Sequence, residues 1–306
     1  MNVFHHTSEA AGKIKNAVVT TGSFDGVHIG HKLIINRLNE IAREIGGESV
    51  LITFYPHPRQ VLYPDQKDLK LINSQEEKIE LLRKAGLDHL IIIPFSVDFS
   101  KTTSRDFVVD MLIGHLNAKV IVVGHNHHFG HARQGDYSYL DVLSKEFGFN
   151  VEEIPLKLIE NETVSSTKIR KALKEGNIQR ANAYLDHQYI LKGKLYAGTH
   201  LSHHFAETVL GIEIPGHEKL IPPPGIYAGN LLVDDQWLKA MTFVIDMPDG
   251  SRQTENLLIY DQLSPSGQTA TLYFYKLVWA GNPANNGEIN AGVLEEAREM
   301  VEDLIY

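Results

Sequence analysis

Short apolar runs alternate with amphipathic stretches through the first half of the chain, and this alternation constrains the fold more than any other feature. Apolar runs bounded by turn residues predict strands, and apolar residues that recur every three or four positions predict helices. The expected strands are residues 17–21, 50–54, 90–95 and 119–123, and the expected helices are about 34–45, 75–85 and one capped by Ser104. The alternation continues to about residue 155. It predicts right-handed crossovers and a parallel sheet whose ligands bind beyond the C-terminal ends of the strands.

The pattern changes in the second half. Expected helices at about 166–175 and 178–185 are followed by β-like runs at 190–195, 226–233, 238–245, 255–260 and 270–278. Pro222 to Pro224 cannot donate to a β-ladder and Gly225 lets the chain bend, so the second run should begin there. We therefore expect a small antiparallel β-barrel with a terminal helix at 293–304. The expected domains are residues 1–186, which are α/β, and residues 187–306.

Composition excludes several classes of function. The chain has 306 residues, 43% of them apolar, which is enough for a core in each domain. No apolar run approaches the roughly 18 residues that a membrane span needs, and no export signal is visible, so we expect a cytoplasmic protein. Without cysteines there is no disulfide, thiolate zinc site or cysteine nucleophile. The net charge of −9 has the wrong sign for a nucleic-acid partner, which leaves small molecules as the expected partners.

The stretch from residue 22 to residue 31, GSFDGVHIGH, joins the first expected strand to the following helix. Gly22 and Gly26 permit a tight turn, and Gly30 leaves room for a ligand at the start of the helix. His28 and His31 are three residues apart, so their imidazoles should share a face of the first helical turn. Helix N-termini favour phosphate, and the imidazoles can donate to phosphate oxygens as charge develops in a transition state. The stretch therefore predicts an ATP site with His28 and His31 as catalytic residues.

Two other interpretations of this histidine pair stay open. The pair could bind zinc, although no third ligand has an obvious spacing. It could also consist of surface histidines on an ordinary capped helix.

Three further motifs follow in the chain, TFYPHP at 53–58, VGHNHHFG at 123–130 and VSSTKIR at 164–170. Together with GSFDGVHIGH they resemble the bacterial FAD synthetases, the bifunctional riboflavin kinase and FMN adenylyltransferase enzymes, within the nucleotidylyltransferase superfamily and its His-x-Gly-His signature. The resemblance implies a Rossmann-like N-terminal domain, with ATP, Mg²⁺ and FMN as substrates and cofactors. It implies attack of the FMN phosphate on the α-phosphorus of ATP, which forms FAD and releases pyrophosphate. The residues expected to bind these molecules are Gly22, Ser23, Phe24, Asp25, Gly30, His57, Asn126, Ser165, Thr167 and Lys168.

The last of the four motifs lies where a helix is expected to begin. Ser165, Ser166 and Thr167 offer hydroxyls and N–H groups, and Lys168 and Arg170 add cations. Together they could hold the β- and γ-phosphates and stabilise the leaving pyrophosphate, with Ser166 and Arg170 as catalytic residues. An ordinary helix cap would need only one of them.

The other two motifs are expected near the flavin. Pro56 and Pro58 restrict the loop around His57, which the resemblance places beside the flavin and the phosphates, although His57 could equally be a turn residue. The histidine-rich residues 125–131 could form a metal site, but no metal ligand is assigned. In the family the position of Asn126 is commonly Asp and that of His128 commonly Arg, and the segment lines the flavin side.

The second half departs from the resemblance. The kinase module of these enzymes ends a glycine-rich loop in Gly-x-Pro-Thr-Ala-Asn, whereas this chain has Phe-Ala-Glu-Thr at 205–208. Glu255 lies where the module has its catalytic Glu, but a lone Glu on a strand is commonly a solvated surface residue. We expect the barrel to persist with doubtful kinase activity. The alternatives are a fully bifunctional enzyme, an adenylyltransferase for a nicotinamide or pantetheine phosphate, and a non-enzymatic flavin-binding or regulatory module.

Overall fold

The computed structural model describes residues 1–65, 69–125, 128–154, 158–159, 162–201, 205, 207–264, 267–284 and 290–304. The chain divides into two compact units. The first unit contains Met1–Leu69 and Lys78–Val164, and the second contains Lys70–Glu77 and Ser165–Tyr306. The predicted boundary near Asp186 concerns functional modules and stays a prediction.

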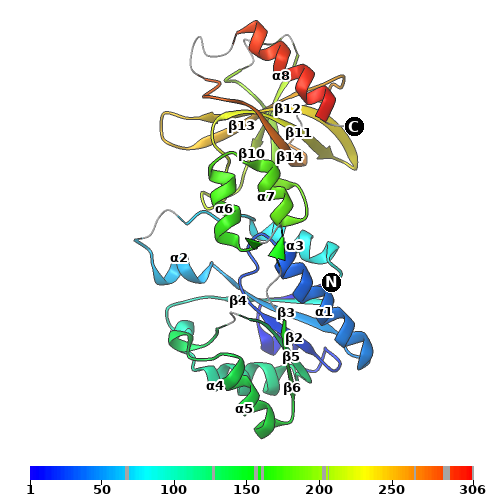
Figure 1. Ribbon diagram of the computed structural model, residues 1–306, viewed down its shortest axis with the longest axis vertical. Helices are drawn as coiled ribbons and strands as arrows, with labels where there is room; N and C mark the ends of the chain where they lie inside the picture. Colours follow the sequence, from blue (N-terminus) through cyan, green and yellow to red (C-terminus); the bar gives the residue numbers. More distant parts are fainter. Residues whose placement is uncertain are drawn as a thin grey trace. The chain divides into compact units, whose positions relative to one another are not determined.

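The first unit is built on a parallel sheet, as predicted, and the sheet has six strands, two more than the sequence analysis named (Figure 1). Its strands lie in the order β1 (Asn2–Phe4), β4 (His89–Pro94), β3 (Ser49–Tyr55), β2 (Val18–Thr21), β5 (Val120–Gly124) and β6 (Asn150–Ile154). After β2 the chain adds β3 and β4 on one side, and it later adds β5 and β6 on the other. The strand order therefore reverses at β2. Ligands of open parallel sheets bind at such a reversal, beyond the C-terminal ends of the strands.

Apolar side chains cover both faces of this sheet, as a parallel sheet requires. Leu51 and Leu90 belong to one buried core, and their neighbours Ile52 and Ile91 belong to the other. The first core also contains residues of α1 (Ile29–Glu44) and α3 (Gln75–Lys84), and the second contains residues of the π-helix η3 (Phe107–His115) and α5 (Tyr137–Phe147). The shorter elements are η1 (Thr7–Ala10), α2 (Pro58–Leu62), η2 (Phe99–Lys101), α4 (Ser104–Asp106), η4 (His131–Arg133), β7 (Leu158–Ile159) and β8 (Glu162–Thr163).

The prediction that Ser104 caps a helix was wrong by one residue. Thr103 is extended, and its hydroxyl accepts a hydrogen bond from the N–H of Asp106. Ser104 is instead the first helical residue, and its hydroxyl donates to the carbonyl of Phe129. Thr103 is the cap because an N-cap residue needs extended backbone geometry, which the residue before the first helical turn has.

The second unit contains a closed six-stranded barrel together with helices α6 (Ser166–Lys174), α7 (Ile178–Leu185) and α8 (Ala291–Leu304) (Figure 1). The barrel order is β10 (Val209–Glu213), β13 (Arg252–Leu258), β12 (Gln236–Asp246), β11 (Gly225–Val233), β14 (Thr269–Ala280) and β9 (Tyr189–Ala197), all antiparallel. Helix α8 packs on β11, β12 and β14, while α6 and α7 precede the barrel. The predicted barrel and terminal helix are confirmed, and β10 is an additional strand.

Residues 70–77 belong to the second unit although they come from the first half of the chain. Leu71 forms a parallel bridge with Lys219. The Lys219 ammonium forms a fully buried ion pair with Glu77, and it also donates to the carbonyl of Ile72. The other carboxylate oxygen of Glu77 accepts from the backbone N–H of Lys192, at 2.9 Å. Burying this pair is tolerable only because several partners share each charge.

Candidate active site

The turn between β2 and α1 has a strained backbone. Phe24 and Val27 have φ angles of 46° and 41°, and Gly26 has a φ of 97°. Residues other than glycine rarely adopt this left-handed region, where each costs of order 1–3 kcal/mol, and such residues cluster at functional sites. The N–H of Gly22 donates to the carbonyl of Ile52, which ties the start of the turn to β3. The turn lies at the C-terminal end of β2, where the strand order reverses.

His28 and His31 form a stacked pair at the start of α1. The helix begins at Ile29, and His28 is its N-cap, because the His28 ring accepts from the N–H of His31 at 3.4 Å. The two ring centroids are 3.6 Å apart at an interplanar angle of 15°. The ring of Phe24 also stacks on His31, at 4.4 Å. The predicted proximity of the two imidazoles is therefore present, but one of them caps the helix instead of projecting from its first turn.

Gly30 serves this pair directly. A β-carbon at Gly30 would lie 3.3 Å from the His28 ring, which is closer than ordinary van der Waals contact. The space expected at Gly30 for a ligand is therefore bounded by the capping ring.

Burial controls the protonation of His31. Its pKa lies well below the ordinary value, first because of burial and then because of the nearby His28 and Lys78. Its Nδ1 atom is buried without a hydrogen-bond partner among the described residues. The His28 residue is 6% exposed. A neutral imidazole has one donor and one acceptor nitrogen, so His31 can still donate to a ligand at neutral pH.

Lys78 is a candidate site residue that the sequence analysis missed. It is 5% exposed, and its ammonium donates to the carbonyl of Ser23 at 3.0 Å. The hydroxyl of Thr53 donates to the same carbonyl at 3.2 Å. The available signal was helical spacing, because Lys78 lies one turn before the buried Leu82 on α3. Asp25, which is 1% exposed, interacts electrostatically with Lys78.

His57 has a definite local role. It is the N-cap of α2, where its Nδ1 accepts from the N–H of Arg59 at 3.2 Å, and it is 8% exposed. The structure therefore gives His57 a local structural role at the start of α2. Its contact with flavin or phosphate stays a prediction.

The described histidines of the segment 125–131 have different neighbours. Asn126 and His127 lie outside the described residues. His125 contacts the carboxylate of Glu153 at 3.1 Å, and His131 contacts the carbonyl of Ser100 at 3.1 Å. Within the described ranges, no three His, Cys, Asp or Glu side chains are grouped so that they could hold a metal ion.

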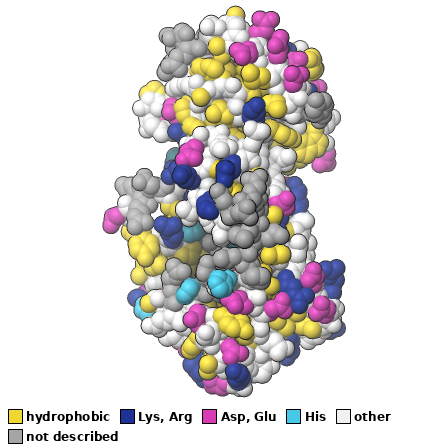
Figure 2. All heavy atoms as spheres, viewed as in Figure 1, with side chains coloured by type: hydrophobic (Ala, Val, Ile, Leu, Met, Phe, Trp, Pro, Cys, Tyr) yellow, Lys and Arg dark blue, Asp and Glu magenta, His cyan; other side chains and the backbone are white. Residues whose placement is uncertain are grey.

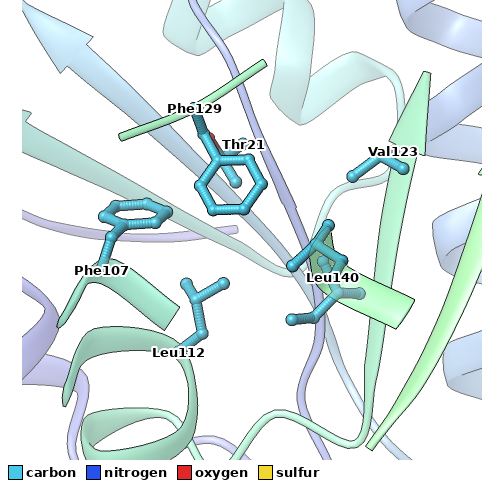
Figure 3. Close-up of a pocket in the computed structure, with 7 residues that line it drawn as sticks. Thr21, Phe107, Leu112, Val123, Phe129 and Leu140 are labelled. Atoms are coloured by element: carbon cyan, nitrogen blue, oxygen red, sulfur yellow. The ribbon is translucent and has the colours of Figure 1, made fainter. Parts of the chain in front are cut away.

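Phe129, in the same segment, faces inward. It packs with Thr21, Phe107, Leu112, Val123 and Leu140 between the sheet and the helices (Figure 3). The gap between these side chains is too small for a water molecule, so this part of the segment is core and not a ligand pocket.

The VSSTKIR motif begins a helix, as expected. Ser165 is the N-cap of α6, and its hydroxyl accepts from the N–H of Lys168 at 3.4 Å. Arg170 donates from Nε to the carbonyl of Lys70 at 3.0 Å. Thr167 and Lys168 are exposed. These residues belong to the second unit, whereas His28 and His31 belong to the first.

Glu255 is neither solvated nor free. It is fully buried on β13, and its carboxylate accepts three backbone N–H groups, from Thr199 at 2.8 Å, His200 at 2.9 Å and Leu201 at 2.9 Å. The interpretation as a solvated surface residue was therefore wrong, because β13 turns this side chain toward the chain that follows β9. Its negative charge also contributes to the raised pKa of Tyr196, after burial.

The parallel sheet, with a strained histidine-bearing turn at its strand reversal, and the separate closed barrel define a nucleotide-binding α/β protein of the nucleotidyltransferase type with a β-barrel module. The chain belongs to the FAD synthetase family, whose model matches residues 11–168. It is 28% identical over 228 residues to the bifunctional riboflavin kinase/FMN adenylyltransferase of Escherichia coli K12, which covers 74% of this chain and 71% of that protein. The enzyme of the same description from Listeria monocytogenes is 30% identical over 222 residues, 72% of this chain and 69% of its own.

One solved structure, described as a macrolide-efflux protein from Streptococcus pneumoniae, matches 99% of this chain and 97% of its own chain. The TM-score is 0.84 and the sequence identity is 24%. This likeness extends to the fold alone.

Separately, none of the described helices combines the length and apolar character that crossing a membrane requires.

Proposed function

We propose that the protein is an FMN adenylyltransferase that makes FAD. A phosphate oxygen of FMN attacks the α-phosphorus of ATP, the bond from that phosphorus to the bridging oxygen of the β-phosphate breaks, and pyrophosphate leaves. The stacked pair of His28 and His31 at the N-terminus of α1 carries this proposal. Family membership supports the same reaction.

The histidine pair suits the charge that develops on the transferred group. The N-terminus of α1 supplies free N–H groups and the positive end of the helix dipole. The buried Nδ1 of His31 lacks a protein partner among the described residues, so a phosphate oxygen would satisfy a group that otherwise costs about 1–3 kcal/mol. No protein nucleophile is needed, and Mg²⁺ enters with ATP as part of the substrate.

The remaining predicted residues are assigned by motif. Ser165, Ser166, Thr167, Lys168 and Arg170 are proposed to hold the β- and γ-phosphates and stabilise the leaving pyrophosphate, which the N-terminus of α6 and the two cations support. Gly22, Ser23, Phe24, Asp25 and Gly30 form or support the turn that receives ATP. On the flavin side the proposed residues are His57, Asn126 and His128.

The function is tested by incubating the protein with MgATP and one acceptor at a time. FMN should yield FAD and pyrophosphate in equal amounts, whereas nicotinamide mononucleotide and pantetheine phosphate should yield no adenylylated product. Adenylylation of either of those acceptors in preference to FMN would contradict the assignment. Tight flavin binding with no product from any acceptor would favour a non-enzymatic module.

We also propose that the barrel does not phosphorylate riboflavin. The carboxylate of Glu255, which would act as the base, already accepts hydrogen bonds from three backbone N–H groups. The Pro-Thr-Ala-Asn signature is also missing from 205–208. Riboflavin and MgATP without FMN should therefore give no product. Accumulation of FMN would show that the enzyme is bifunctional.

We propose that the protein acts in the cytoplasm on small molecules and does not bind nucleic acid. The net charge of −9 supports this, because nucleic-acid binding depends on a positive surface. On the face drawn in Figure 2, basic side chains (dark blue) are interspersed with acidic ones (magenta).

A further inference from the structure

We propose that Lys78 is a positioning residue for adenylyl transfer: it holds the turn between β2 and α1 in the shape that stacks His28 on His31. This inference rests on the proposed function. Lys78 comes from α3, which is separate in sequence from the turn that it contacts. Its side chain is buried, although lysine is rarely buried in proteins.

The geometry shows what Lys78 holds. Its ammonium and the Thr53 hydroxyl both donate to the carbonyl of Ser23, at 3.0 and 3.2 Å. Ser23 immediately precedes the strained residue Phe24, whose ring stacks on His31. Two donors on one carbonyl fix the peptide plane at the point where the chain enters the left-handed region. A strained conformation persists only where its surroundings determine it in this way.

Charge gives Lys78 a second effect on the same pair. Burial lowers the pKa of Lys78, and Asp25, which lies inside the turn and is 1% exposed, offsets part of this shift by favouring the charged form. Burial is the main cause of the lowered pKa of His31, and His28 from the turn and then Lys78 from α3 lower it further. A positive charge close by disfavours a second one, so Lys78 helps to keep His31 neutral.

Lys78 is not expected to touch ATP. Its ammonium is committed to the Ser23 carbonyl and to the neighbourhood of Asp25, and the side chain is buried. A small displacement of the histidine pair is still costly, because a misplacement of about 1 Å can reduce a rate roughly 100-fold. Lys78 should therefore affect kcat much more than the KM for ATP.

The experiment compares three substitutions of the full-length protein. Lys78→Met removes the donor and the charge, Lys78→Gln keeps a donor without the charge, and Lys78→Arg keeps both. Lys84→Met is the matched control, since Lys84 lies on the same helix with its side chain 59% exposed. For each variant we measure kcat and KM for FAD formation against pH. The titration of His31 is followed by NMR of labelled histidine without substrate.

Lys78→Met should lower kcat roughly 10- to 100-fold with little change in the KM for ATP. Lys78→Gln should recover most of the rate at high pH. Both variants should raise the pKa of His31, because the positive charge of Lys78 is gone. On acidification, the rate of Lys78→Gln should therefore begin to fall at a higher pH than the rate of the wild type. Lys78→Arg should rescue both properties, and Lys84→Met should resemble the wild type. If Lys78→Met does not fold, the comparison of the Gln and Arg variants, which both keep a donor, still isolates the effect of the charge.

Two results overturn the inference. One is a kcat of Lys78→Met close to wild type with the pKa of His31 unmoved; if Lys78→Met does not fold, an unmoved pKa of His31 in Lys78→Gln takes its place. The other is a loss of rate that neither Gln nor Arg relieves while the pKa of His31 stays unmoved, because Lys78 would then act only through stability. If the wild type makes no FAD, the proposed function fails, but the NMR titration still reports on Lys78 and His31.

Discussion

At the scale of single residues, the two histidines should differ in what they contribute to the fold and to the rate. His28→Ala and His31→Ala should each lower kcat for FAD formation roughly 100-fold or more, the scale seen when a transition-state donor is lost. His28→Asn should keep the helix start, because Asn caps helices well, and still lose the rate. The exposed His5→Ala provides the control. Near-normal rates in both alanine variants would refute the assigned roles.

The depressed pKa of His31 also predicts how stability depends on pH. Between the lowered folded pKa and the unfolded value near 6.5, the unfolded chain binds a proton that the folded protein does not. The free energy of unfolding should therefore fall on acidification through this window, by up to about 1.4 kcal/mol per pH unit for this one group. His31→Gln should lessen this loss in urea unfolding followed by circular dichroism, while His5→Gln should not. Equal losses in the His31 variant and the wild type would contradict the prediction.

At the scale of elements, residues 70–77 are held in the second unit by the buried pair Glu77–Lys219. Lys219→Met leaves a buried carboxylate without its cation and should cost about 3–5 kcal/mol in the free energy of unfolding. Adding Glu77→Gln should restore part of the loss, because the uncompensated charge is then gone.

The tryptophans make this measurement specific to one unit. Both of them, Trp237 and Trp279, lie on strands of the barrel, so their fluorescence reports its unfolding in urea. The exposed ion pair of Lys171 and Glu175, in the same unit, supplies a control, since Lys171→Met should change stability by about 1 kcal/mol at most. A double variant no more stable than Lys219→Met would show that the orphaned charge is not the main cost.

At the scale of the whole molecule, a chain of net charge −9 must accept an anionic triphosphate. The cations proposed for the phosphates, Lys168 and Arg170, are few, so Mg²⁺ should supply much of the neutralisation. Chelation with EDTA should lower FAD formation roughly 100-fold or more, and added Mg²⁺ should restore it. Calcium at the same concentration tests whether ion size and geometry matter, because Mg²⁺ demands a stricter octahedral shell. Unchanged activity in EDTA would contradict this dependence.

Much of this molecule is determined by the sequence alone. The alternation of apolar runs and helical periods specifies the parallel sheet, and the proline-glycine turn before β11 helps specify the barrel. The stretch from Gly22 to His31 places a histidine pair at a strand end and a helix start, because these features depend on neighbouring residues. Local spacing is sufficient for them.

Only the tertiary structure decided how the site is held and which side chains remain free. Lys78 donates from helix α3 to the carbonyl of Ser23 in the turn. The carboxylate of Glu255 accepts the N–H groups of residues 199–201, and residues 70–77 belong to the barrel unit. Each of these contacts joins residues far apart in the chain, and each depends on burial of a charge that sequence patterns treat as exposed. Periodicity reports which face of an element is apolar, whereas the partner of a buried charge is set by the packing of the whole fold.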